Sequence, residues 1–311
     1  MSNQILIWVL FNVFVLTMLF LDLAVFHRRS HEVKIKEALL WSAVWITIAL
    51  IFNVIVYFWQ GTDHALKFLT GYLIEKSLSV DNLFVFIMIF SYFAVDAKYQ
   101  HKVLFWGILG ALIMRAIFIL TGVVLINKFH WVIYIFGVFL IFTGIKMAKK
   151  HGPEVRPEKN PLLKLLRKFL PVTKTFENDR FLVKKSGKVY ATPLLVVLVV
   201  VESTDLIFAV DSIPAILAVT TDPFIVYSSN VFAILGLRAL YFALAGFIQK
   251  FRFLHYALAT MLIFVGIKML IADIYKIPIA IALGAVAGIM LASILASIFI
   301  PEEKSKKIET I

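Results

Sequence analysis

The chain has 311 residues, of which 61% are apolar and 16% are charged, and its mean hydropathy is +0.93. Soluble domains contain about 45–50% apolar and about 25% charged residues, so this composition excludes an ordinary soluble protein and a disordered chain. The sequence has no cysteine, which excludes a disulfide scaffold, an iron–sulfur cluster and thiol chemistry. The formal net charge is +12, and its distribution distinguishes a nucleic-acid-binding protein from a membrane protein.

Nine apolar stretches are long enough to cross a bilayer, which takes about 20 helical residues. They lie at about residues 5–26, 38–59, 65–94, 102–126, 130–148, 190–220, 224–249, 253–272 and 278–300. The first stretch has no basic residues before it and no small-residue cleavage site, so we expect a retained span and not a signal peptide. The sequence predicts an all-α polytopic membrane protein with about nine transmembrane helices.

The basic residues predict the orientation of these spans. With the N-terminus outside, Lys67, Lys128 and Lys276 lie on the outer side and four more basic residues lie within spans. The other 24 of the 31 Lys and Arg residues then face the cytoplasm. Because cytoplasmic loops are enriched in Lys and Arg, we expect the N-terminus outside and the C-terminus inside. The positive charge is thus a topology signal, and no nucleic-acid partner is expected.

The spans divide the chain into two membrane halves, 1–148 and 190–300, separated by a basic cytoplasmic loop at 149–189 and followed by a cytoplasmic tail at 301–311. Within the loop, residues 161–171 place Lys164, Arg167 and Lys168 on one helical face and leucines on the other. This pattern predicts a short amphipathic helix on the inner leaflet; the alternative is a solvated linker. The sequence leaves the oligomeric state open.

An internal repeat spans the two halves. Three landmarks recur in the same order, at offsets of 122 to 130 residues: LIFTGIKM (140–147) and LIFVGIKM (262–269), Arg115 and Arg238, and the acids Glu75 and Asp81 with Asp205 and Asp211. Each unit, about 65–148 and about 190–272, contains three predicted spans. An odd number of spans inverts the second unit relative to the first, as in many secondary transporters. The alternative is a duplication in a scaffold protein.

Six carboxylates fall within predicted spans: Asp22, Glu75, Asp81, Glu202, Asp205 and Asp211. A charge at bilayer depth costs about 2.5–3.5 kcal/mol on insertion scales, and such residues usually face a protein interior or a water-filled path. The spans that hold five of these acids are unusually long, which predicts a tilted or broken helix. Pro214 favours a break, because it frees the carbonyl of Val210 beside Asp211.

The polar groups near these acids are all oxygen donors, including the amide of Asn82 and the hydroxyl of Ser212. Such a set suits magnesium, calcium or manganese and disfavours zinc and copper. The alternative is that the acids only pair with the four intramembrane bases. Six acids against four bases leave two carboxylates, so pairing does not account for all of them. The bases are Lys76, Arg115, Arg238 and Lys268.

The last predicted span has a stripe of small residues, Gly284, Gly288, Ala292 and Ala296. Small residues at this spacing are typical of close helix packing. We therefore expect this stripe to contact a neighbouring helix.

Four motifs resemble the TerC family of integral membrane proteins, in particular its Alx-like members. They are GYLIEKSLSVDNLFVF (71–86), VESTDLIFAVDSIPAILAVTTDPF (201–224), ILGLRALYF (234–242) and LIFVGIKMLIAD (262–273). The resemblance implies manganese export across the bacterial inner membrane as a metal-homeostasis function. By motif, it implies a metal site at Glu75, Asp81, Asn82, Glu202, Asp205, Asp211 and Ser212, with a looser match at Asp22.

These observations predict an exporter of a hard divalent cation and not an enzyme, with no resident cofactor. Asp81 and Asp211 are the expected core ligands, and Glu75 and Asp205 are charge partners or second ligands. Glu202 is a candidate proton acceptor, which makes proton antiport a hypothesis. Arg115 and Arg238 are expected to pair with the site after the cation leaves, with Lys76 and Lys268 as further compensating charges. The alternative is a membrane-embedded stress-response scaffold or regulator of the tellurium-resistance type, acting through its basic cytoplasmic loop.

Overall fold

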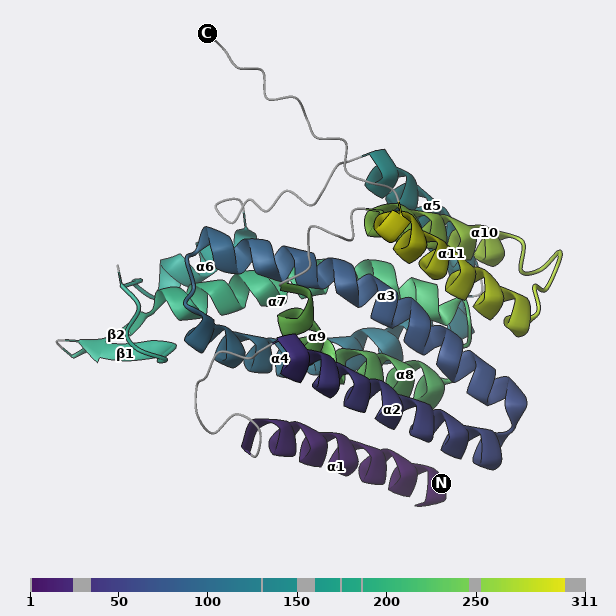
Figure 1. The fold of residues 1–311 in the computed structure, drawn as a ribbon, viewed down its shortest axis with the longest axis horizontal. Coiled ribbons are helices and arrows are strands. Elements are labelled where there is room, and N and C mark those ends of the chain that lie inside the picture. The colour runs from purple at the N-terminus through teal and green to yellow at the C-terminus, as the bar shows by residue number, and fades with distance from the viewer. Residues whose placement is uncertain are drawn as a thin grey trace, which may run out of the picture.

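The computed structural model describes residues 2–24, 35–129, 131–149, 160–173, 175–185, 187–245 and 253–299. Long helices lie side by side along the longest axis, and a small hairpin projects at one end (Figure 1). The helices of the first half are α1 (Ser2–Ala24), α2 (Ile35–Gln60), α3 (Thr62–Tyr92), α4 (Ala97–Lys128) and α5 (Val132–Lys149). The loop and second half contain α6 (Pro161–Phe169), β1 (Leu182–Lys185), β2 (Lys188–Ala191), α7 (Pro193–Leu217), α8 (Pro223–Leu235), α9 (Leu237–Ala245), α10 (Leu254–Leu270) and α11 (Ile279–Phe299).

The long helices are those of a multi-pass membrane protein. Within the described residues, six segments are long and apolar enough to cross a bilayer: α2, α4, α5, α7, the α8–α9 pair and α11. The described parts of α1 and α10 contribute shorter apolar helices, at Ile5–Leu21 and His255–Leu270. Helices satisfy their own backbone hydrogen bonds, which lipid requires. The all-α polytopic class is therefore confirmed, and nine spans stay a prediction.

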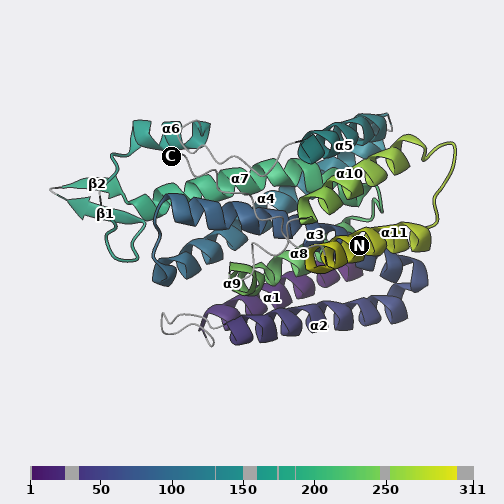
Figure 2. The same cartoon turned by 45° about the horizontal axis from the view of Figure 1, so that its top comes forward.

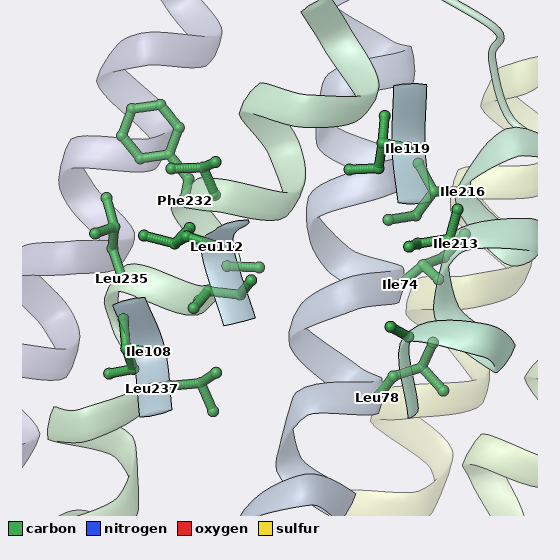
Figure 3. Packing of buried hydrophobic residues seen from close by; sticks show 14 of the residues in the cluster. Ile74, Leu78, Ile108, Leu112, Ile119, Ile213, Ile216, Phe232, Leu235 and Leu237 are labelled. Carbon is green, nitrogen blue, oxygen red and sulfur yellow. The ribbon is translucent and has the colours of Figure 1, made fainter. Parts of the chain in front are cut away.

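The core lies between α3, α4, α7 and α8, where α3 and α4 each pack against both α7 and α8. Ile74 and Leu78 of α3 approach Ile213 and Ile216 of α7, while Phe232 of α8 lies near the middle of α4 (Figure 3). All five side chains are buried. Because packing is a main force between helices in lipid, this interdigitation fixes which helix faces meet at the centre of the molecule.

The expected break near Asp211 is wrong. Helix α7 continues through Pro214 to Leu217, and α3 is also one continuous helix. Pro214 lies in the last turn of α7, and Val210, whose carbonyl it leaves free, has an exposed side chain. The helix therefore loses one hydrogen bond without unwinding.

A break occurs instead within the span predicted at 224–249, where Gly236 separates α8 from α9. The ammonium of Lys76 donates to the carbonyl of Ala233 at 3.2 Å. A Cβ atom on Gly236 would lie 2.8 Å from the Lys76 Nζ. The break is thus stabilised by a cation at the C-terminal end of α8, where the helix dipole is negative.

Helices α5 and α10, which carry the two LIFxGIKM motifs, pack closely against each other. A Cβ on Gly144 would lie 2.7 Å from the carbonyl oxygen of Ala259, and one on Gly266 would lie 2.7 Å from that of Gly137. The earlier residue of α5, Gly137, lies opposite the later residue of α10, Gly266, and Gly144 lies opposite Ala259. The two helices are therefore antiparallel. Gly144 and Gly266, like Gly137 and Ala259, are 122 residues apart in the sequence, so equivalent positions make reciprocal contacts.

Within the described part of this chain, the α11 stripe does not pack against another helix. Among the described residues, nothing lies within 4 Å of a Cβ built on Gly284 or Gly288. Helix α11 instead buries Ala282, Val286 and Ser293 against its neighbours. Spacing alone identified a smooth helix face but not the direction in which that face points.

The basic loop forms α6 and the β1–β2 hairpin at one end of the molecule (Figure 2). The Asn160 side chain caps α6 by accepting from Leu162 N at 2.9 Å, and it donates to Ser203 of α7 at 2.5 Å. Leu163 is buried, so α6 lies alongside α7. Nearby, a hydrogen bond from Lys102 lowers the pKa of Asp179 below its ordinary value and ties the loop to α4.

Candidate site around Arg115

The guanidinium of Arg115 lies at the centre of the helix core. It projects from α4 and is 1% exposed. It forms an ion pair with Glu75 of α3, and it reaches both carboxylate oxygens of Asp205 on α7, at 3.2 and 3.4 Å. Both acids are buried. One guanidinium therefore joins two acids that are distant in sequence and come from different units of the repeat.

Two neutral side chains complete this cluster. The Ser212 hydroxyl and the Asn230 amide oxygen each lie 3.4 Å from an Arg115 nitrogen. Ser212 was predicted, whereas Asn230 on α8 was not. The signal for Asn230 is the polar run Ser228–Asn230 inside an otherwise apolar helix, which costs energy unless its groups find partners. We name the set Glu75, Arg115, Asp205, Ser212 and Asn230 the Arg115 cluster.

The cluster retains polar atoms with unused hydrogen-bonding capacity. Within the described part of the chain, Glu75 Oε2 and Asn230 Nδ2 of the cluster are buried without a hydrogen-bond partner, as is Ser79 Oγ, four residues after Glu75 on α3. Buried polar groups are usually satisfied, and an exception often marks a site for an ion or a water molecule. The two carboxylates share one guanidinium, and Glu75 Oε2 has no hydrogen-bond partner. Such a pair is suited to binding a proton or a metal ion.

Two further predicted acids lie on α7 outside the cluster. Glu202 is partly exposed, contacts α4 at Gly110 and interacts with the charge of Asp205. Asp211 faces α5, where it interacts with Thr143 and Lys146. Because successive helical residues are rotated by about 100°, Asp211 cannot share the direction of Ser212. The structure therefore does not bring Asp211 together with Glu75 and Asp205.

The predicted compensating bases have different roles. Arg115 pairs with site acids, as described above, and Arg238 is buried in α9. Lys76 and Lys268 donate to the carbonyls of Ala233 and Ala218, each at 3.2 Å. Both carbonyls lie at the C-terminal ends of helices, so these lysines stabilise helix ends.

The comparisons with known proteins agree with the sequence motifs. Residues 60–305 match the profile of the Integral membrane protein TerC family. The chain belongs to the TerC family. An uncharacterized membrane protein of Myxococcus xanthus is 53% identical to it, covering 94% of this chain and 92% of its own length. An Escherichia coli K12 protein, provisionally named membrane-bound redox modulator Alx, is 51% identical over 97% of both chains.

An uncharacterized membrane protein of Rickettsia bellii is a further relative, with 43% identity over 94% of this chain and 96% of its own length. No solved structure matches the chain significantly. Family membership confirms the resemblance that the four motifs indicated.

Of the other residues in the TerC motifs, Asn82 is buried in α3. The side chains of Asp81 in α3 and Asp22 in α1 lie outside the described part of the structure, so their predicted places are not tested. Among the residues that the structure describes, no three His, Asp or Glu side chains lie close enough to hold a metal ion together. The described candidate site is thus a charge-paired cluster, with Glu202 beside it.

Proposed function

We propose that this TerC-family protein exports a hard divalent cation, specifically manganese, across the bacterial inner membrane. The observation that carries the proposal is the sharing of Arg115 by Glu75 and Asp205 in the buried core. Because buried acids are costly without a positive partner, the site favours a cation whenever the guanidinium moves away. All candidate ligands are oxygens, which suits manganese, and the TerC resemblance favours manganese over calcium and magnesium.

In this proposal Arg115 and the transported ion alternate. A cation that reaches Glu75 and Asp205 displaces the guanidinium, and the guanidinium pairs with the two carboxylates again once the ion has left. The acids then always have a positive partner, which lowers the cost of an empty site. Glu202 would exchange protons for the cation, so we expect uptake by vesicles to respond to a pH gradient.

We also propose that α3–α5 and α7–α10 are inverted copies that alternate access to the cluster. The reciprocal contacts of Gly144 and Gly266 support this proposal. A two-fold axis in the membrane plane relates antiparallel helices and pairs equivalent residues in this way. The cluster draws its acids from the first helix of each copy, and transporters built from inverted repeats bind their ions at the interface between the copies.

A second candidate function is a membrane-embedded regulator acting through residues 149–189. The exposed apolar side chains Leu165 and Phe169 of α6 favour it, because they would suit a partner. The name of the Escherichia coli relative suggests redox modulation. A thiol mechanism is excluded here because the chain has no cysteine. We propose no enzymatic activity for either function.

Metal uptake into proteoliposomes tests the proposal. We expect saturable manganese uptake, with calcium and magnesium as weaker competitors. Glu75→Gln, Asp205→Asn, Asp81→Asn and Asp211→Asn should reduce uptake, the first two by more than about tenfold because they leave Arg115 without a full partner. Asp179→Asn, an exposed loop acid, is the matched control. No saturable uptake by the wild-type protein would overturn the exporter, and a cellular stress response that survives loss of both Glu75 and Asp205 but fails when loop lysines are replaced would favour the regulator.

A further inference from the structure

Gly110 on α4 faces Glu202 on α7 where the two helices leave no room for another side chain. A Cβ atom on Gly110 would overlap Cδ and both oxygens of the Glu202 carboxyl group. Two other glycines of α4 also face α7, but a Cβ on them would meet apolar atoms: Val201 at 3.3 Å for Gly107 and Leu217 at 2.8 Å for Gly122. Among the α4 glycines facing α7, Gly110 is therefore the one whose missing side chain accommodates a charged group.

The Glu202 carboxyl depends on this space for its position. Within the described residues, no ion pair or hydrogen bond of this carboxyl is seen, and it interacts with the charge of Asp205. Glu202 and Asp205 are three residues apart, so they lie on the same helix face. Gly110 itself lies five residues, about 7.5 Å along α4, before Arg115. The space at Gly110 thus sets how close a third carboxylate comes to the Arg115 cluster.

We infer that Gly110 is a positioning residue, which holds the Glu202 carboxylate beside Asp205 and thereby increases the affinity of the Arg115 cluster for its cation. The inference rests on the proposed function. Its physical basis is that charge interactions weaken with distance and with exposure to water. An added methyl group at position 110 would move the carboxylate outward. The displaced group is the end of a flexible side chain, so the helices need not separate.

Manganese binding to the purified full-length protein tests this inference without relying on transport. Free aqueous manganese gives an electron paramagnetic resonance signal that falls on binding, so a titration gives the dissociation constant. We expect Gly110→Ala to weaken binding by about tenfold, the lower end for loss of a supporting residue at a metal site. Gly122→Ala is the matched control, because it adds the same methyl group to the same helix against an apolar side chain.

Rescue by a shorter acid separates positioning from packing. Aspartate is one methylene shorter than glutamate, so Gly110→Ala combined with Glu202→Asp should bind manganese within about threefold of wild type, a difference of about 0.65 kcal/mol. Gel filtration shows whether each variant is folded. If Gly110→Ala is poorly folded, the double variant Gly110→Ala/Glu202→Asp is compared with the single variant Glu202→Asp. The shorter acid leaves room for the methyl group at position 110, so the two proteins should bind manganese equally well. Weaker binding by the double variant overturns the inference.

The outcomes distinguish this inference from the proposed function. Unchanged binding in Gly110→Ala overturns the inference, and so does weakened binding that Glu202→Asp fails to restore. In both cases wild-type binding, and its loss in Glu75→Gln, would leave the proposed function standing. Absence of saturable manganese binding in the wild-type protein would overturn both.

Discussion

Arg115 is a buried cation that holds together acids from two separate helices. A buried ion pair contributes little net stability, because desolvation offsets the attraction, but removing one partner leaves an uncompensated charge. The guanidinium contacts Glu75, Asp205, Ser212 and Asn230 from one position. A lysine could not reproduce this planar, multidentate geometry.

We therefore predict that Arg115→Met lowers the free energy of unfolding by about 3–5 kcal/mol. Manganese or calcium should restore part of this loss, because a divalent cation can take the place of the guanidinium. Tryptophan fluorescence during heating, with and without divalent cation, measures both effects.

The triple variant Arg115→Met/Glu75→Gln/Asp205→Asn provides the control. It should recover stability and lose the response to metal, since no buried charge then remains in the cluster. An Arg115→Met protein as stable as wild type would show that the two acids carry no charge that needs compensation.

Helices α5 and α10 show how glycine position determines packing. Gly144 and Gly266 bring main chains into contact, whereas Gly284 and Gly288 on α11 face open space. The two groups look alike in sequence, since each glycine lies in an apolar run. They differ in the rotation of the helix relative to its neighbours, which the apolar run does not encode.

We predict that Gly144→Ala lowers the free energy of unfolding by about 1–3 kcal/mol, the usual cost of overpacking. The added Cβ would meet the Ala259 carbonyl oxygen at 2.7 Å, and a main-chain atom cannot move aside without separating the helices. Gly288→Ala, the matched control, should change stability by less than about 0.5 kcal/mol. Thermal unfolding of both variants under the same conditions provides the comparison, and equal effects would contradict the packing seen between α5 and α10.

At the scale of the whole molecule, the orientation in the membrane determines which end of the core opens to the cytoplasm. The hairpin and α6 lie at one end of the molecule (Figure 1), and together they carry Lys164, Lys168, Lys184, Lys185 and Lys188. The opposite end carries the connections between α2 and α3 and between α10 and α11. From the positive-inside rule we predict that the basic end faces the cytoplasm.

Single introduced cysteines test this orientation. Because the sequence contains no cysteine, a thiol reagent labels the introduced residue alone. A membrane-impermeant maleimide should label Lys276→Cys in intact cells, and it should label Asn178→Cys only after the membrane is opened. Labelling of Asn178→Cys in intact cells would reverse the proposed orientation and, with it, the direction of export.

The sequence by itself determined the class of protein and the residues that carry its unusual chemistry. Hydropathy identified a lipid environment, because apolar helical runs of this length are stable only there. The intramembrane acids identified Glu75 and Asp205, because a charge in a predicted span is conspicuous whatever the fold, and the TerC motif added Ser212. Four motifs identified the TerC family.

Only the tertiary structure decided which of these residues meet. Helical periodicity relates positions on one helix, such as Glu202 and Asp205, but it does not give the rotation of that helix against the next. The sharing of Arg115, the contribution of Asn230 and the turn of Asp211 toward α5 all depend on that rotation. It is set by close packing over the whole core, where the contacts of many distant residues decide the result together.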